Sequence, residues 1–377
     1  MNLKIKCLIF AGNLHVGGGV QVAASFIQEM MLFESDLSNI TVFVSSEVAC
    51  NIDMNSPNIQ RFNGLKIVNA YGIGIFNSEL NYEMDQFDIV FTIFGPLYRW
   101  KTPFKSIVGF AQPWIIYPKN DCIDKLSVFS ALQLRIKYWI QGIYFRRADA
   151  LIVELDHVRD KLIRYLGVRS EVVTVVRNCL SSNFRNEFEW IPIEMPLSDC
   201  DLRLGFLGRN YPHKNTHIFP AIAKVLYENY HTKVKFFVTF TESEWRNCTQ
   251  EFQSVCINVG PLKVAECPMF YRALDGVVFP SLLECFSATP LEALAMERPL
   301  FASDREFNHD ICGTYATYFD PLDAEDAARV IAQYFQQGAS DDNCLQLARN
   351  HAMNFSTADV RASQYLECIL RVSSNLA

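Results

Sequence analysis

The sequence predicts an α/β fold made of two doubly wound domains, and three observations support this prediction. Short apolar runs with the length of buried strands alternate with helical patterns along most of the chain. A polar or glycine-rich loop follows the first predicted strand of each half, where such domains bind their ligands. A length of 377 residues exceeds what one typical hydrophobic core holds. We therefore expect two domains of similar architecture.

The N-terminal half begins with a predicted strand over 4–11, a glycine-rich loop over 12–19 and an apolar-periodic helix from about 20 to 33. This order is typical of the start of a doubly wound domain. The remaining strands predicted in this half are 40–44, 65–69, 87–94, 106–111, 149–154 and 172–176. The glycines allow backbone amides to approach a ligand closely, and a plain tight turn is the alternative interpretation.

The glycine-rich loop does not have the spacing of a dinucleotide-binding fingerprint. Gly-x-Gly-x-x-Gly would require a third glycine where Val22 stands. The sequence therefore disfavours a nicotinamide-dependent oxidoreductase.

The C-terminal half is separated by residues 181–201, which are polar, contain two prolines and interrupt the periodicity. We expect an N-terminal domain over 1–185, a C-terminal domain over 200–355 and a final helical segment over 356–377. The strands predicted in the second domain are 202–207, 234–240, 256–259, 276–280 and 299–302.

The stretch 276–298 reads GVVFPSLLECFSATPLEALAMER and predicts a strand, a loop and a helix. Thr289 suits the N-cap and Glu292 stands three residues later. Loop amides and the helix dipole favour an anion at this helix start, and a diphosphate fits there. Glu292 is placed to accept hydrogen bonds from both hydroxyls of a ribose. The alternatives are a capping box, in which Glu292 bonds the Thr289 amide, and a solvated loop charge for Glu284.

A second loop, Gly208-Arg209-Asn210-Tyr211-Pro212-His213-Lys214-Asn215, directly follows the strand over 202–207. Arg209 offers a planar fork for phosphate oxygens and Lys214 a mobile point charge. Because both emerge from one tight loop, we expect them to converge on one diphosphate. Two solvated loop charges are the alternative.

Composition and charge exclude several classes of function. The formal net charge of −7 argues against nonspecific nucleic-acid binding. The 12 cysteines are scattered, without the spacings of a zinc site or a disulfide framework, and indicate reduced cytoplasmic thiols. The histidines show no metal-ligand spacing, so no metal is expected.

The apolar run near the N-terminus is too short for a signal peptide, and no run reaches the length of a membrane span.

A predicted helix over 131–148 combines aromatic residues with four cations, Arg135, Lys137, Arg146 and Arg147. Such a composition can place a helix on an anionic lipid surface. The alternative, which we prefer from the sequence, is a core helix whose basic ends reach into water.

Two of these motifs together resemble glycosyltransferase family 4. Pro280-Ser281-x-x-Glu284, seven residues and Glu292-Ala-x-Ala resemble its paired-glutamate signature, and Gly208-Arg209, four residues and Lys214-Asn215 resemble its diphosphate-binding element. The resemblance covers nearly all the chain and is specific over 204–321. It implies a GT-B fold, in which two Rossmann-like domains face each other across a cleft and a C-terminal helix crosses back to the first domain.

The resemblance also implies site roles. Arg209 and Lys214 are expected on the donor diphosphate, Glu284 on the transferred sugar and Glu292 on the ribose. Further contacts with the nucleotide sugar are implied for Gly18, Gly19, Gly208, Pro261, Leu262, Phe286, Ser287, Ala288 and Thr289. Cys285 and Ser287 stand where the family usually has glycines, which affects the path of the loop amides and the donor that they select.

Gln112 stands where many family members have a histidine beside the reacting sugar. We expect it to hydrogen-bond a sugar hydroxyl as part of the catalytic set. The alternative is a buried strand end with a stacked Trp114.

The resemblance predicts a retaining enzyme of bacterial polysaccharide or O-antigen biosynthesis. It would transfer a sugar from a nucleoside diphosphate to a hydroxyl of a saccharide or lipid-linked saccharide. The nucleotide sugar is its co-substrate, with no further cofactor and no nucleic acid. We expect the protein in the cytoplasm. Peripheral binding to the inner face of the membrane is a further expectation. Two alternatives are a GT-B nucleotide-sugar epimerase and a non-catalytic nucleotide-sugar-binding protein.

Overall fold

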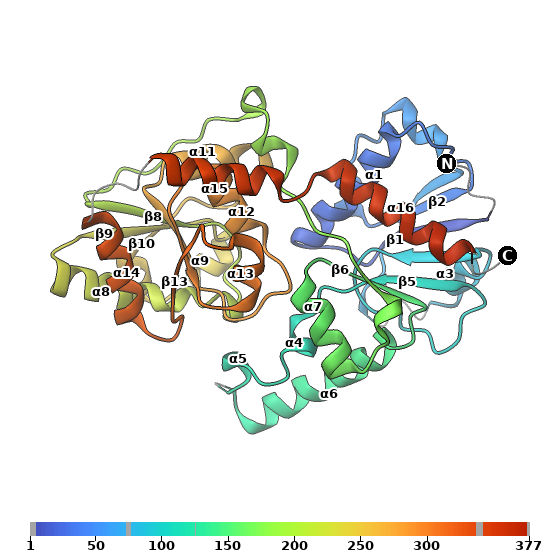
Figure 1. Cartoon of the computed structure of the whole chain (residues 1–377), viewed down its shortest axis with the longest axis horizontal. Coiled ribbons are helices and arrows are strands. Elements are labelled where there is room, and N and C mark those ends of the chain that lie inside the picture. The colour runs from blue at the N-terminus through green and yellow to red at the C-terminus, as the bar shows by residue number, and fades with distance from the viewer. Residues whose placement is uncertain (1–4, 73–76, 125, 337–341, 375–377) are drawn as a thin grey trace. The chain divides into compact units, whose positions relative to one another are not determined.

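The computed structural model describes residues 5–72, 77–124, 126–336 and 342–374 (Figure 1). The chain forms two compact units. The N-terminal unit comprises Met1–Pro118, Ser127–Asn178 and Ser356–Ala377, and the C-terminal unit comprises Lys119–Leu126 and Cys179–Phe355.

In its described residues, the N-terminal unit contains a parallel sheet of seven strands in the order β3-β2-β1-β4-β5-β6-β7. The strands are β1 Cys7–Ala11, β2 Ile40–Val44, β3 Gly64–Ile67, β4 Ile89–Thr92, β5 Lys105–Gly109, β6 Ala150–Val153 and β7 Val173–Val175. In register, Cys7 of β1 lies opposite Ile40 of β2 and Ile89 of β4. The strand order therefore changes direction beside β1, which makes the β1/β4 edge the topological switch point of this sheet.

Helices cover this first sheet, and the last helix of the chain belongs to them. They are α1 Gly18–Leu32, α2 Ser46–Ala49, α3 Ser78–Met84, α4 Pro113–Ile116, α6 Val128–Phe145, α7 Asp156–Lys161 and α16 Ala358–Ser374. Figure 1 shows α16 beside α1. The ring of Tyr365 on α16 packs edge-on against Phe26 and Phe91, at centroid distances of 5.0 and 5.3 Å. The return of the chain to this unit thus buries aromatic surface in its core.

The part of the C-terminal unit that the structure describes contains a second parallel sheet, of six strands in the order β10-β9-β8-β11-β12-β13. The strands are β8 Leu202–Phe206, β9 Val234–Val238, β10 Cys256–Asn258, β11 Gly276–Phe279, β12 Leu300–Ser303 and β13 Thr317–Phe319. Its helices are α5 Asp121–Asp124, α8 Phe219–Tyr230, α9 Glu242–Arg246, α10 Gln250–Val255, α11 Cys267–Arg272, α12 Ala288–Ala295, α13 Glu306–Cys312, α14 Ala324–Gln336 and α15 Asp342–Asn354.

The core of this unit is aromatic. Phe206 of β8 lies between Phe219, Phe240 and Phe279, with ring centroids 6.1 to 6.4 Å away. Such pairs stabilise beyond the area that they bury. They fix β8 against β11 and so position the loops that follow these two strands.

The α/β architecture with two parallel sheets confirms the predicted fold class, and each predicted strand overlaps an observed strand in the described residues. Two helix predictions need correction. The helix expected at 131–148 is α6, which begins at Val128 because the Ser127 hydroxyl caps it by accepting from the Ser130 amide at 3.2 Å. The helix expected to be capped by Thr289 begins at Ala288, with Ser287 as its N-cap residue.

Candidate functional site

The predicted diphosphate and glutamate loops lie at the same edge of the C-terminal sheet. β8 and β11 are hydrogen-bonded neighbours, and the strand order changes direction between them, with β9 and β10 on one side and β12 and β13 on the other. The loops 207–215 and 280–287 follow the carboxyl ends of these strands. In open α/β sheets this switch point is where ligands bind.

Lys214 and Glu284 meet between the two loops. The Lys214 Nζ lies 2.6 Å from Glu284 Oε1, and the Ser281 hydroxyl donates to the same oxygen at 2.9 Å. The side chains of Lys214 and Glu284 are only 15% and 10% exposed. The backbone also joins the loops, since the Leu282 amide donates to the His213 carbonyl at 2.8 Å. Solvated loop charges are therefore the wrong interpretation for this pair.

The turn that carries Lys214 is fixed by its neighbours in sequence. Pro212 begins a 3₁₀ turn over Pro212–Lys214, and Asn215 ends it in the left-handed region with φ of 57°. Asparagine tolerates this conformation better than most residues. Its buried side-chain amide donates to the Pro321 carbonyl at 2.7 Å, so the direction of Lys214 is set by a buried anchor.

Arg209 makes a different ion pair. Its Nε lies 2.8 and 3.0 Å from the two carboxylate oxygens of Glu244, and the Asn210 amide donates to Glu244 Oε1 at 3.1 Å. The Arg209 side chain is 44% exposed. The two loop cations are thus each paired with their own carboxylate, and their joint contact with a diphosphate stays a prediction.

Glu244 is a residue that the sequence analysis missed. It stands three residues after Thr241, and the two form the capping box of α9. That Thr-x-x-Glu pattern was visible in the sequence, but it does not indicate that the carboxylate also bonds an arginine in another loop.

Glu292 accepts a hydrogen bond from the Tyr271 hydroxyl, with the oxygens 2.8 Å apart, and Thr289 Oγ1 donates to the Leu207 carbonyl at 3.1 Å. The capping-box alternative for Thr289 and Glu292 is therefore wrong. The physical reason is that Tyr271 is fully buried and its hydroxyl needs an acceptor, which Glu292 supplies. Burial raises the pKa of Glu292 to about 7, although the Tyr271 hydrogen bond opposes this shift.

Gly208 has a conformation that favours glycine. Its φ is 153°, and a Cβ at this position would lie 3.3 Å from the Phe206 ring. Its amide donates to Thr239 Oγ1 at 3.0 Å. The amide after β8 is therefore turned toward β9.

The remaining predicted donor contacts in this unit lie on its loops. Pro261 is exposed and Leu262 half-buried, directly after Gly260 with its φ of 87°. The ring of Phe286 lies 6.4 Å from that of Phe355. Ser287 and Ala288 form the start of α12. Their proposed contacts with a nucleotide sugar stay predictions.

The N-terminal unit holds the other predicted residues. Gly18 and Gly19 are the first residues of α1, and the preceding Gly17, with φ of 74°, provides the turn into the helix. Gln112 is the N-cap residue of α4 and makes no capping bond with its side chain. Trp114 stacks on Tyr138, with ring planes 2° apart. The predicted stacking of Trp114 is thus confirmed, but the segment is not a buried strand end, because β5 ends at Gly109 and Gln112 is half-buried at the start of α4. A sugar contact of Gln112 stays a prediction.

His15, in the glycine-rich loop, is another residue without a predicted role. Its Nδ1 lies 2.9 Å from Glu47 Oε2, its Nε2 lies 3.1 Å from the Ala70 carbonyl, and its ring stacks on Tyr71. These contacts hold the loop after β1 against residues that follow β2 and β3. In the sequence, His15 could have been singled out because it is a titratable residue within the glycine-rich loop.

Three kinds of comparison show which known proteins the chain is similar to. Residues 201–337 match the sequence profile of the family described as "Glycosyl transferases group 1". Over 199 residues the chain is 23% identical to the O-antigen chain mannosyltransferase RfbU of Salmonella typhimurium, covering 49% of this chain and 53% of that protein. The match thus spans about half the length of this curated relative.

Among solved structures, sucrose-phosphate synthase from Thermosynechococcus elongatus superposes with a TM-score of 0.72 at 13% identity, covering 98% of this chain and all of that one. HepE of Anabaena, solved in complex with UDP, superposes with a TM-score of 0.65 at 12% identity, covering 97% of this chain and all of that one. These neighbours have the GT-B fold, and so does this chain. The β8 and β11 loops lie inside the segment that matches the family profile.

Proposed function

We propose that the protein is a retaining glycosyltransferase of family 4. In this proposal it transfers a sugar from a nucleoside diphosphate to a hydroxyl of a saccharide or lipid-linked saccharide, in peripheral contact with the inner face of the membrane. The observation that carries the proposal is the sheltered Lys214–Glu284 pair at the β8/β11 switch point, next to the start of α12. The profile match over 201–337 supports the transferase class, and the similarity to an O-antigen mannosyltransferase supports a saccharide acceptor.

The chemistry assigns a role to each charge. Negative charge develops on the leaving diphosphate, and a cation that is already in place lowers the barrier without reorganisation. Lys214 is such a cation, because Glu284 and the anchored turn hold it. Arg209 would add its terminal nitrogens while its Nε remains on Glu244. Glu284, which already accepts from Lys214 and Ser281, would also accept from hydroxyls of the transferred sugar.

Charge compensation in this proposal comes from Lys214, Arg209 and the amides at the start of α12. Among the residues that the structure describes, no three His, Cys, Asp or Glu side chains are grouped to hold a metal ion. Transfer without a metal stays a prediction, which activity in the presence of a chelator would test.

The first test is binding of nucleoside diphosphates by thermal shift. A ligand at 100 times its Kd stabilises the folded state by about 2.7 kcal/mol, which is readily seen as a rise in Tm. We expect one of UDP, GDP and ADP to raise the Tm, and the matching monophosphate to raise it less because it lacks the second phosphate. If no diphosphate or sugar derivative shifts the Tm, the donor site is contradicted.

Product analysis then separates the three candidate activities. A transferase forms a glycosylated acceptor and releases the nucleoside diphosphate with it. The epimerase alternative converts the sugar without an acceptor, and the binding-protein alternative shows a thermal shift without turnover.

The raised pKa of Glu292 predicts a pH-dependent affinity for the nucleotide. Because burial raises this pKa to about 7, the carboxyl is partly protonated at neutral pH. Two ribose hydroxyls donate best to the ionised form, so the affinity should increase as pH rises from 6 to 8. Isothermal titration at both values checks this, with Glu292→Gln as the matched control. Ionisation of the nucleotide affects the wild type and Glu292→Gln equally, so it does not contribute to the difference between them. An equal pH dependence of the two proteins would contradict the ribose role.

A further inference from the structure

The helix α6 has an apolar face that points to solvent. Its exposed apolar side chains are between 41% and 88% accessible, and they are Val128, Phe129, Leu132, Ile136, Trp139 and Ile140. At 100° per residue these six positions fall within about 120° of the helix circumference. Of the described α6 residues, only Gly142 and Phe145 are buried. The preferred interpretation from the sequence, a core helix, is therefore wrong.

The surroundings of this face are basic. The segments 95–105 and 126–148 contain no Asp or Glu, although the whole chain carries a net charge of −7. Their cations are Arg99, Lys101, Lys105, Arg135, Lys137, Arg146 and Arg147. Arg99 pairs with Asp85 and Lys105 with Asp149, at 2.6 and 2.9 Å, while Lys101 is exposed. An excess of positive charge therefore remains beside the apolar face.

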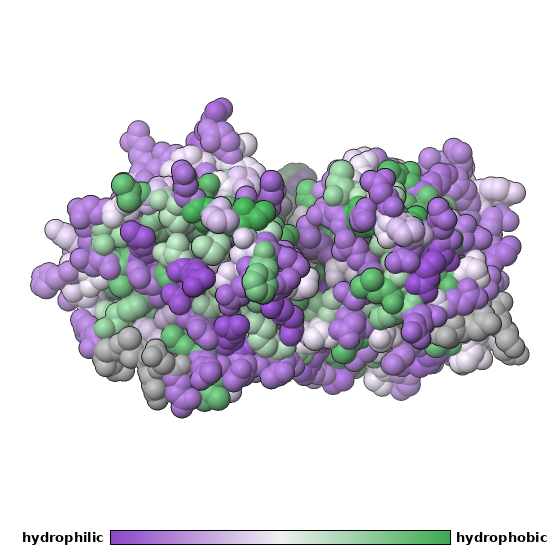
Figure 2. All heavy atoms as spheres, turned by 90° about the horizontal axis from the view of Figure 1, so that it is seen from above, coloured by the Kyte–Doolittle hydropathy of each residue, from purple (hydrophilic) through white to green (hydrophobic). Residues whose placement is uncertain are grey.

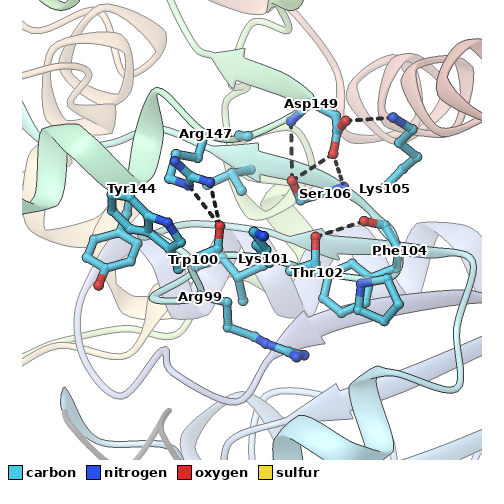
Figure 3. Close-up of a pocket in the computed structure, with 14 residues that line it drawn as sticks. Arg99, Trp100, Lys101, Thr102, Phe104, Lys105, Ser106, Tyr144, Arg147 and Asp149 are labelled. Carbon is cyan, nitrogen blue, oxygen red and sulfur yellow. Dashed lines mark hydrogen bonds and ion pairs between the residues drawn. The ribbon is translucent and has the colours of Figure 1, made fainter.

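A pocket of about 380 Å³ adjoins the C-terminal end of α6 (Figure 3). The Arg147 guanidinium lies 4.0 Å from the centroid of the Trp100 ring and donates to the Trp100 carbonyl from Nε at 2.9 Å and from a terminal nitrogen at 2.6 Å. Tyr144 packs edge-on against the same ring. Trp100 is 59% exposed. The pocket thus combines an exposed aromatic ring with basic side chains, at the end of the apolar face.

We infer that the apolar face of α6 and this basic pocket form a docking surface for an anionic lipid bilayer. Apolar and tryptophan side chains would enter the interface, and the cations would contact lipid phosphates. Elsewhere, on the side drawn in Figure 2, hydrophobic residues are interspersed with hydrophilic ones. No helix of the described part of the chain is long and apolar enough to cross a bilayer, so the inferred mode is adsorption.

Charge favours a bilayer over a second copy of the chain. A self-complementary contact through α6 would bring the cations of both copies together, without a carboxylate from segments 95–105 or 126–148 to neutralise them. An anionic membrane supplies the complementary charge. The inference rests on the proposed function in one respect only: that function identifies the bilayer as the membrane that holds the lipid-linked acceptor.

The test is co-sedimentation of the full chain with vesicles of phosphatidylcholine, alone or mixed with phosphatidylglycerol. We expect binding to the anionic vesicles only, weakened by high salt. Trp139→Asp should weaken binding about tenfold or more, because it removes a large apolar side chain from the interface. Arg135→Gln with Lys137→Gln should weaken it about fivefold per charge. The matched controls on α8, Tyr227→Asp and Lys224→Gln, alter side chains that are 65% and 70% exposed and should bind like the wild type.

Three outcomes would overturn the inference. They are absence of binding to anionic vesicles, unchanged binding of Trp139→Asp, and a concentration-dependent dimer that Trp139→Asp abolishes without any vesicle binding. Thermal shift with nucleoside diphosphate is measured on the same variants and should remain as in the wild type. A failed donor site and a failed docking surface are therefore distinguishable.

Discussion

Replacing Lys214 by alanine is expected to lower kcat/KM for the nucleotide sugar about 10²- to 10³-fold. This is the range seen when one preorganised electrostatic contact to a developing negative charge is removed. The substitution also leaves Glu284, whose side chain is 10% exposed, without the cation 2.6 Å away. Steady-state kinetics with release of the nucleoside diphosphate measures the effect.

A second measurement separates chemistry from folding. An uncompensated buried charge destabilises a protein by about 3–5 kcal/mol, so Lys214→Ala should also unfold at lower urea concentration. Lys214→Met combined with Glu284→Gln removes both charges and should recover most of this stability while remaining inactive. Lys224→Ala, at a site 70% exposed on α8, controls for the loss of one positive charge. Activity of Lys214→Ala within about threefold of wild type would contradict the role given to Lys214.

The sheets could be predicted from the sequence because their strands are short apolar runs between loop signals. The unpredicted strand, β13, is only three residues long, Thr317–Phe319, and two of them are half-buried. It lies at the edge of the sheet, where a strand needs less apolar sequence.

The site was predictable in part, for a different reason. Lys214 and Glu284 lie on loops that follow strands β8 and β11, and the parallel topology brings such loops to one edge of the sheet. The partners of Arg209 and Glu292 are Glu244 and Tyr271, which are 35 and 21 residues away in the chain. Local patterns give no signal for such tertiary contacts.

The helix α6 shows the limit of periodicity. A stripe of apolar residues at helical spacing has the same sequence pattern whether it packs into a core or faces an interface. The accessibility of Phe129 and Trp139, about 70% each, decides between the two. This information depends on which face of α6 the rest of its unit covers, and that is a property of the fold.

A loss of stability as large as that of Lys214→Ala is expected for changes at Arg361, which is 2% exposed on α16. Its guanidinium donates to Asn178 Oδ1 and, at 2.8 Å, to Ser25 Oγ, and the Asn178 amide donates to Glu154 Oε1 at 2.7 Å. Arg361→Met should lower the free energy of unfolding by about 3–5 kcal/mol, because it leaves this buried network without its cation. Urea denaturation checks the value. Arg371→Met, at an exposed position of the same helix, is the matched control.

The pH dependence of this variant tests whether Arg361 acts through the charge of Glu154. Burial raises the pKa of Glu154 to about 7, while the Asn178 hydrogen bond and the Arg361 charge oppose the shift. The contribution of this carboxyl to the free energy of unfolding is therefore fully present below its pKa in the unfolded state, about 4.3, and is lost as pH rises through 7. Without Arg361 the pKa rises further, so the loss continues to higher pH. The difference in free energy of unfolding between Arg361→Met and wild type should be larger at pH 8 than at pH 5. In proteins that also carry Glu154→Gln, this difference should be the same at both pH values. An equal gap at both pH values would mean that Arg361 stabilises α16 by hydrogen bonding alone.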